Sequence, residues 1–274
     1  MHSTRIAYLG PAGTFTEEAA RRFRLDGEYV PVDSPAAALE AVAQGEADWA
    51  VCAIENSVDG AVTSTADALA GTPGAQIYGE TELAIAFAMM TRPGESLADA
   101  HRLATHPVAE RQVKQWIADN APGVEFLPAS SNAAAAKMVA DGAADLAAAP
   151  ERAADLFGLQ VHARGVADSE TARTRFVLVG KQGETPAATG NDRTALVFQT
   201  PNEPGALVGV LQEFAQRDVD MSRIESRPTK KEPNTYIFFV DLVGHITDEP
   251  VAEAVRAVGE KVSSIRVLGS WPRA

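Results

Sequence analysis

The sequence contains almost no cysteine, and its histidines lack the spacing of a metal site. Cys52 is the only cysteine, so the chain can form neither an internal disulfide nor a cysteine-rich zinc site. No two of the five histidines are four residues apart, as two metal ligands on one helix would be. The single cysteine fits a reducing compartment, and the composition gives no sign of a bound metal.

Long apolar runs and positive charge are also scarce. The most apolar stretch, residues 83–90, is far shorter than the roughly 18 residues that span a bilayer, and no apolar segment of signal-peptide length precedes Gly10. The chain has 24 Lys and Arg against 37 Asp and Glu, and a net charge of −13 repels nucleic acid and anionic membranes. We therefore expect a cytoplasmic protein that binds neither nucleic acid nor a membrane.

An internal repeat is the most informative pattern in the 274 residues. Segments 34–50 and 131–147 are identical at ten of 17 aligned positions. Each copy is typical of a serine-capped helix, a glycine stop and a strand buried on both faces. The repeat therefore predicts two similar α/β lobes, with helices packed on sheets through a core rich in alanine.

The C-terminal part of the chain has a different pattern. Residues 183–193 have no hydrophobic periodicity and contain glycine, proline and asparagine, which is typical of a linker. Residues 194–272 then follow the order βαββαβ, the ferredoxin-like arrangement. Before the linker, we predict a strand over residues 83–90 and a helix over residues 108–119.

Polar side chains mark three places where a ligand could bind. Thr14 begins a helix directly after a strand. The first backbone amides of this helix could hold an anion, or the segment could simply be a tight turn. Asn56 and Ser57 follow a buried strand, where they could form the rim of a pocket or cap the next helix. Ser130 and Ser131 stand at the matching helix start of the second copy, where helix capping alone would explain them.

Three other candidates have stronger structural alternatives. Thr174 and Arg175 open a strand that returns from one lobe to the other, so they could face a cleft, although an exposed arginine at a strand start is the simpler interpretation. Gln112 lies on a predicted helix, where glutamine usually faces solvent. His106 precedes a proline, and a histidine in such a loop is more often structural than catalytic.

Taken together, these motifs resemble prephenate dehydratases of the single-function type, in which an ACT regulatory domain follows the catalytic domain. The motifs of the catalytic part are Gly10–Phe15, Glu55–Ser57 with Gly60, His106–Pro107 with Gln112, Ser130–Ser131, Ala153–Ala154 with Gly158–Leu159, and Thr174–Phe176. Those of the regulatory part are Asn202–Leu207 and Glu225–Pro228. Their order and spacing over nearly the whole chain make the resemblance specific.

The resemblance implies a catalytic module of two lobes, similar to periplasmic solute-binding proteins, over residues 1–182. Lobe 1 would comprise about residues 1–79 and 166–182, lobe 2 about residues 80–165, and the ACT domain residues 194–272. Thr174 would be the essential catalytic residue and Arg175 would contact substrate. The residues implied to line the same cleft are Thr14, Asn56, Ser57, Gln112, Ser130, Ser131 and Phe176.

The implied activity is the conversion of prephenate to phenylpyruvate, CO2 and water, without a cofactor. Phenylalanine would inhibit it by binding between ACT domains of a homodimer or homotetramer. The residues implied for that allosteric site are Asn202, Gly205, Ala206, Leu207, Glu225, Ser226, Arg227 and Pro228. Two alternatives stay open: an arogenate dehydratase, and a non-catalytic sensor of amino acids.

Overall fold

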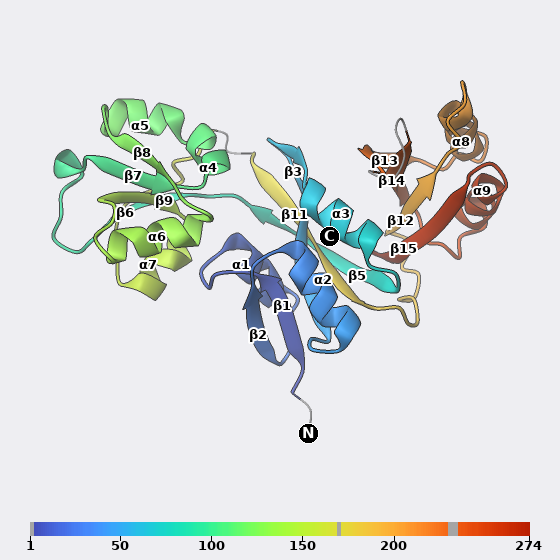
Figure 1. The fold of residues 1–274 in the computed structure, drawn as a ribbon, viewed down its shortest axis with the longest axis horizontal. Helices are drawn as coiled ribbons and strands as arrows, with labels where there is room; N and C mark the ends of the chain where they lie inside the picture. The colour runs from blue at the N-terminus through green and yellow to red at the C-terminus, as the bar shows by residue number, and fades with distance from the viewer. Residues whose placement is uncertain (1–2, 169–170, 230–234) are drawn as a thin grey trace.

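The computed structural model describes residues 3–168, 171–229 and 235–274. Three units lie side by side along the longest axis of the molecule, with lobe 1 in the middle, lobe 2 at one end and the C-terminal domain at the other (Figure 1). The chain leaves lobe 1 through one long strand and returns through another, so the two lobes are joined by two crossings.

Lobe 1 is built on a mixed sheet. Its elements are β1 (Arg5–Leu9), α1 (Phe15–Arg22), β2 (Glu28–Val32), α2 (Pro35–Gln44), β3 (Trp49–Asn56), β4 (Gly60–Ala61), α3 (Thr63–Gly71), β5 (Ala75–Ala84) and β11 (Arg173–Lys181). β1 runs parallel to β2 and β3, while β11 lies antiparallel between β3 and β5. Because strand side chains alternate, Ile6 and Tyr8 pack with α1 on one face and Ala7 packs with α2 on the other.

Lobe 2 repeats the same kind of packing on a sheet of five strands. Its elements are β6 (Ala88–Thr91), the short helix η1 (Leu97–Asp99), β7 (Arg102–Thr105), α4 (Pro107–Gln112), α5 (Lys114–Asn120), β8 (Glu125–Pro128), α6 (Asn132–Ala140), β9 (Leu146–Ala149), α7 (Glu151–Phe157) and β10 (Gln160–Arg164). The prediction of one strand over residues 83–90 is wrong. β5 ends at Ala84 and β6 begins at Ala88, because the chain crosses between the lobes there, later than the predicted boundary at residues 79 and 80.

The two copies of the repeat occupy matching places in the two lobes. Ser34 accepts a hydrogen bond from the backbone N–H of Ala37 at 3.0 Å, and Ser131 accepts one from Ala134 at 3.0 Å. Each serine therefore caps its helix, α2 or α6, and each helix leads into a buried strand, β3 or β9. The predicted pair of similar lobes is confirmed.

The C-terminal domain has the predicted ferredoxin-like fold. Its elements are β12 (Asp192–Gln199), α8 (Ala206–Ala215), β13 (Met221–Pro228), β14 (Tyr236–Val243), α9 (Glu249–Gly259) and β15 (Ser264–Pro272). The strand order is β13-β14-β12-β15, and α8 and α9 pack on one face of this sheet through a core that includes Phe198, Val210 and Val258. The other face is turned toward lobe 1 (Figure 1).

Backbone pairing at Gly269 joins the sheets of the two domains. β15 runs parallel to β5, with Gly269 paired to Ile77, so one sheet continues from lobe 1 into the C-terminal domain. A Cβ atom at position 269 would lie 2.2 Å from the carbonyl oxygen of Ile77. Only glycine allows the two backbones to approach this closely.

Candidate functional site

Two adjoining cavities lie in the cleft between the lobes. Their volumes are about 400 Å³ and 160 Å³, and both are lined by Phe15, Thr16, His106 and Asn132. Lobe 1 contributes β3, β11 and the first residues of α1 and α3, while lobe 2 contributes α4 and the start of α6. The cleft is therefore enclosed by both lobes and by β11, one of the two strands that cross between them.

Three helices of the catalytic module begin at these cavities. Phe15, Thr63 and Asn132, the first residues of α1, α3 and α6, all line them. The first backbone amides of a helix have no carbonyl partner and carry a partial positive charge, which attracts anions. Among the described residues that line the cavities there is no lysine or arginine, and Asp59 is the only carboxylate. An anionic ligand would therefore be held mainly by backbone amides.

Thr174 lies at the wall of the larger cavity with its hydroxyl already oriented. The side chain is 7% exposed, and its Oγ1 accepts a hydrogen bond from Nδ2 of Asn56 at 2.9 Å. The amide of Asn56 is fixed in turn, because its Oδ1 accepts from the backbone N–H groups of Val58 at 2.8 Å and Asp59 at 3.1 Å. With Asn56 as donor, the hydroxyl proton of Thr174 is free to point toward a ligand.

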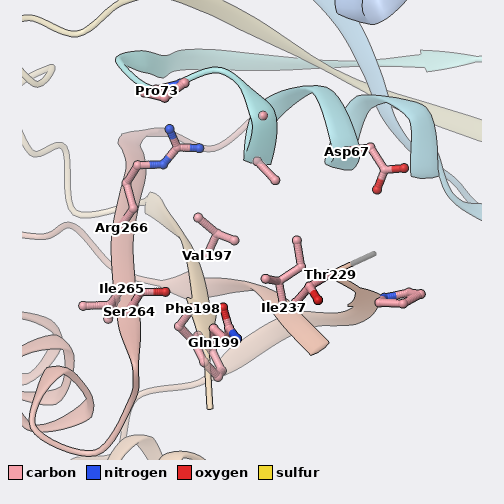
Figure 2. A pocket seen from close by; sticks show the side chains of 13 residues that line it. Asp67, Pro73, Val197, Phe198, Gln199, Thr229, Ile237, Ser264, Ile265 and Arg266 are labelled. Carbon is pink, nitrogen blue, oxygen red and sulfur yellow. The ribbon is translucent and has the colours of Figure 1, made fainter. Parts of the chain in front are cut away.

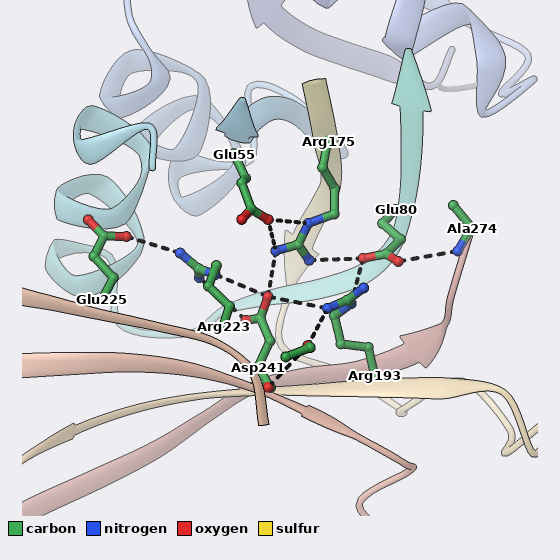
Figure 3. Close-up of polar contacts among 9 residues, drawn as sticks. Glu55, Glu80, Arg175, Arg193, Arg223, Glu225, Asp241 and Ala274 are labelled. Carbon is green, nitrogen blue, oxygen red and sulfur yellow. Dashed lines mark hydrogen bonds and ion pairs between the residues drawn. The ribbon is translucent and has the colours of Figure 1, made fainter. Parts of the chain in front are cut away.

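Arg175 does not lie where the resemblance implies. Neighbouring strand residues point to opposite faces, so Thr174 and Phe176 face the cleft while Arg175 points toward the C-terminal domain. Its guanidinium pairs with Glu55 at 3.0 Å, Glu80 at 3.1 Å and Asp241 at 2.5 Å (Figure 3). Burial opposes its charge, but Asp241 and Glu80 outweigh this and raise the pKa of Arg175. Its donors are engaged away from the cavities.

Gln112 lies in the cleft rather than facing solvent. The predicted helix over residues 108–119 is broken at Val113 into α4 and α5, which turns Gln112 inward, where it is 5% exposed. Its Nε2 donates to Asp59 of lobe 1 at 3.2 Å, and the neighbouring Arg111 pairs with the same carboxylate at 2.6 Å. Its Oε1 is buried without a hydrogen-bond partner among the described residues. Gln112 therefore joins the lobes and keeps an unused acceptor.

The other predicted cleft residues divide into two groups. Ser130 and Ser131 line the smaller cavity, and Phe176 lines the larger one. Ser57 lines neither; its hydroxyl accepts from the backbone N–H of Arg173 at 2.9 Å and fixes the crossing strand. Ser57 therefore stabilises the strand beside the cavities and does not line them.

Thr14 lines the smaller cavity and caps α1. Its Oγ1 accepts from the backbone N–H of Glu17 at 3.3 Å, while Glu17 accepts from Gly13 at 2.6 Å. Glu17 also pairs with Arg152 of lobe 2 at 3.2 Å, so it links the lobes. Burial opposes ionisation, but the Gly13 amide and the arginines Arg21 and Arg152 outweigh it and lower the pKa of Glu17.

His106 is a residue of the cleft that sequence reasoning treated as structural. It lines both cavities, and its Nδ1 lies 3.2 Å from the backbone N–H of Val108, which donates to it. Burial and the nearby Arg111, opposed by Asp59, lower the pKa of His106. A neutral ring that accepts at Nδ1 carries its proton on Nε2. The signals in the sequence are the position of this histidine before a proline and its place in the His106–Pro107 motif.

The first of the two predicted effector motifs lines a small cavity in the C-terminal domain. Asn202, Ala206 and Leu207 line this space of about 170 Å³, together with Tyr236 and Phe238. Gly205 is the N-cap of α8 and has the left-handed conformation, with a φ of 85°. The cavity lies at the start of α8 and is lined by both polar and apolar residues.

The second motif lies on the strand β13, outside that cavity. Glu225 pairs with Arg223 at 3.0 Å, Arg227 pairs with Asp67 of α3 at 2.8 Å, and Ser226 is exposed. Pro228 lines a space of about 570 Å³ between α3 and the sheet of the C-terminal domain (Figure 2). Neither of these two cavities is lined by residues of both motifs.

The described residues form neither a metal site nor a reactive cysteine. Within residues 3–168, 171–229 and 235–274, no group of three or more His, Cys, Asp or Glu side chains is arranged to hold a metal ion. Cys52 is buried, which raises the pKa of its thiol to about 12 and makes it unreactive. No helix in the part of the chain that the structure describes is long and apolar enough to cross a membrane.

Two protein families match the two parts of the chain. The family model described as "Prephenate dehydratase" matches residues 6–184, and the model described as "ACT domain" matches residues 194–260. The order of the two models and the point where one gives way to the other agree with the lobes and the ferredoxin-like domain of the structure.

Relatives cover nearly the whole chain. A Corynebacterium glutamicum protein named prephenate dehydratase is 54% identical over 98% of this chain and 88% of its own length. The structure of an Arthrobacter aurescens prephenate dehydratase in complex with L-Phe has a TM-score of 0.93 and 39% identity, over 99% of this chain and 90% of that one. GqqA, described as a novel type of quorum-quenching acylase, has a TM-score of 0.89 and 32% identity over 98% of both chains. The family match and the identities show that the chain belongs to the prephenate dehydratase family.

Proposed function

We propose that this chain converts prephenate to phenylpyruvate, CO2 and water in the cleft between the lobes. The observation that carries the proposal is the hydroxyl of Thr174, which accepts from Asn56 and so has its own proton available to a ligand in the larger cavity. Prephenate has two carboxylates and a ring hydroxyl that must leave. The reaction therefore needs anion binding together with a donor at the leaving oxygen.

Backbone amides supply the anion binding in this proposal. The starts of α1, α3 and α6 bring unpaired N–H groups to the cavities from both lobes. No step is assigned to Arg175, because its guanidinium pairs with Asp241 on the far side of the strand. Arg111 pairs with Asp59 at the wall of the larger cavity and so offsets the charge of that carboxylate.

Loss of CO2 and of the hydroxyl group are coupled through the ring. The C–C bond to the ring carboxylate breaks, its electron pair makes the ring aromatic, and the C–O bond at the opposite carbon breaks. The departing oxygen takes a proton and leaves as water, and a positioned donor accelerates such a step about 10²- to 10⁴-fold. Thr174 is a weak acid, so it acts as a hydrogen-bond donor to this oxygen or as one station of a relay. Aromatisation supplies the driving force, and no cofactor is required.

Aromatic side chains contribute to the apolar lining of the larger cavity. Phe15 and Phe87 meet edge to face with ring centroids 5.7 Å apart, and Phe176 lines the same space. These rings exclude water from the reacting carbon atoms. A carboxylate held in such surroundings is less well solvated than in water, which favours its departure as neutral CO2.

The acylase named among the structural neighbours makes amide hydrolysis the competing hypothesis. A threonine nucleophile needs an adjacent base to take its proton. In the described part of the chain, the side chain hydrogen-bonded to Thr174 Oγ1 is the amide of Asn56, which donates and cannot accept the proton through Nδ2. The geometry therefore supports dehydration better than acyl transfer.

Regulation by phenylalanine is the second part of the proposal. The small cavity at Asn202, Ala206 and Leu207 would supply one half of the effector site, and the motif from Glu225 to Pro228 of a second copy would supply the other. The Arthrobacter aurescens structure, a complex with L-Phe, supports phenylalanine as a ligand of this family. We further propose a homodimer or homotetramer that works in the cytoplasm.

The test is a substrate panel with the purified wild-type protein. Prephenate, arogenate and an N-acyl homoserine lactone are supplied in parallel, and phenylpyruvate, phenylalanine and free fatty acid are measured. The proposal expects phenylpyruvate from prephenate at the highest kcat/KM, and inhibition by added phenylalanine. A higher kcat/KM on arogenate or on the lactone would replace the proposal, and no turnover of any of them would favour an amino-acid sensor.

A further inference from the structure

A cluster of buried charges lies where the ACT domain meets the catalytic module. Asp241 on β14 is fully buried and contacts three arginines: Arg175 at 2.5 Å, Arg223 at 3.1 Å and Arg193 at 3.7 Å (Figure 3). Burial alone would raise the pKa of Asp241, but Arg223 and Arg175 outweigh it and lower that pKa. The carboxylate is therefore ionised and common to arginines of both domains.

Arg175 is the only one of these arginines that belongs to the catalytic module. It is 5% exposed, and it follows Thr174 directly on β11. Its guanidinium is held from both domains, because Glu80 of β5 binds it at 3.1 Å and Asp241 binds it at 2.5 Å. A guanidinium fixed in this way restrains the backbone of its own strand, and so the residue beside it.

The same cluster reaches the second effector motif. Arg223 binds Asp241 through Nε and Nη2, and it binds Glu225 through Nη1 at 3.0 Å. Glu80 completes the cluster on the other side, where Arg193 lies 3.0 Å away and the backbone N–H of Ala274 donates to it at 3.2 Å. A continuous chain of contacts therefore runs from Glu225 through Asp241 to the strand that carries Thr174.

We propose that Asp241 of the ACT domain is a positioning residue for catalysis, which sets the place of the Thr174 hydroxyl by holding Arg175. This inference rests on the proposed dehydratase activity. The anion-binding helix starts are not part of the cluster, so loosening it moves the proton donor but leaves substrate binding in place. The effect therefore falls on kcat more than on KM. Arg175, in the same way, is a positioning residue rather than a ligand of the substrate.

The kinetic test uses Asp241→Asn, which keeps the shape of the side chain and removes its charge. Since a misplacement of about 1 Å can cost about 100-fold in rate, we expect kcat on prephenate to fall about 10- to 100-fold, with KM changed less than about threefold. Thr194→Val is the matched control: Thr194 is equally buried in the ACT domain and bonds to Ser270 and Gly244, away from the catalytic module. A folded Asp241→Asn variant with the kcat of the control overturns the inference.

A second variant covers the case in which Asp241→Asn does not fold. Arg175→Lys keeps the positive charge but cannot bind Glu55, Glu80 and Asp241 together. The inference expects the same loss of kcat at nearly constant KM. A large rise in KM with kcat unchanged would show that Arg175 binds substrate, which contradicts the inference.

A measurement without substrate separates this inference from the proposed function. Amide hydrogen exchange at residues 173–177 should be faster in Asp241→Asn than in wild type, and unchanged in Thr194→Val. Unchanged exchange in Asp241→Asn would overturn the positioning role even in an active enzyme. If exchange is faster in Asp241→Asn but the wild-type protein does not turn over prephenate, the structural link is kept and the dehydratase proposal is rejected.

Discussion

Replacing Gly269 with alanine tests how the two domains are joined. The new Cβ would lie 2.2 Å from the carbonyl oxygen of Ile77 and 3.0 Å from its N and C atoms. These are backbone atoms, so no side-chain rotation relieves the clash, and β15 must move away from β5. Overpacking of this kind costs about 1–3 kcal/mol. At about 2–4 °C per kcal/mol, the thermal midpoint should fall by about 2–12 °C.

The assay is a thermal melt followed by circular dichroism, with Gly259→Ala as the matched control. Gly259 is the last residue of α9, and a Cβ there meets only Ile265 at an ordinary distance of 3.8 Å. The control should melt at or above the wild-type temperature, since alanine is the better helix former. If Gly269→Ala melts with the control, the close pairing of β15 and β5 does not join the domains as described.

Two further predictions concern the cleft. Arg111→Ala should raise KM for prephenate, because the carboxylate of Asp59 then repels the dianion without compensation. The control Lys114→Ala, on the neighbouring exposed turn, should leave KM unchanged. Glu17 has a lowered folded-state pKa, so it contributes stability above its unfolded pKa of about 4.5, and this is lost as the pH falls through the folded value. Acid titration of the melting midpoint should therefore be shallower below about pH 4.5 in Glu17→Gln than in wild type; equal slopes would contradict the assignment.

Local patterns predicted the helix starts and the buried strands of the fold. Ser34 and Ser131 cap their helices because a hydroxyl at that position satisfies a free amide, which depends only on neighbouring residues. The break at Val113 escaped prediction, and with it the inward position of Gln112. The hydrophobic pattern of residues 108–119 continues through the break. The contacts of α4 with lobe 1, such as that of Gln112 with Asp59, are not encoded by neighbouring residues.

The site shows the same division between local and distant determinants. Thr174 and Asn56 could be singled out because they follow or begin strands at the crossing, although they are 118 residues apart. The orientation of Arg175 depends on which face of β11 is turned to the cleft, and its partner Asp241 lies 66 residues away in another domain. Strand alternation allowed one of Thr174 and Arg175 to face the substrate, but only the assembled sheet decides which.

The central claim is that the Thr174 hydroxyl donates to the leaving oxygen of prephenate. Thr174→Val removes this hydroxyl and nearly preserves the shape of the side chain, while Thr174→Ser keeps the hydroxyl and serves as the control. The measurement is kcat for phenylpyruvate formation by each variant, with folding checked by circular dichroism. The account predicts a loss of at least about 100-fold for valine and most of the activity for serine. A folded valine variant with kcat within a few-fold of wild type would contradict it.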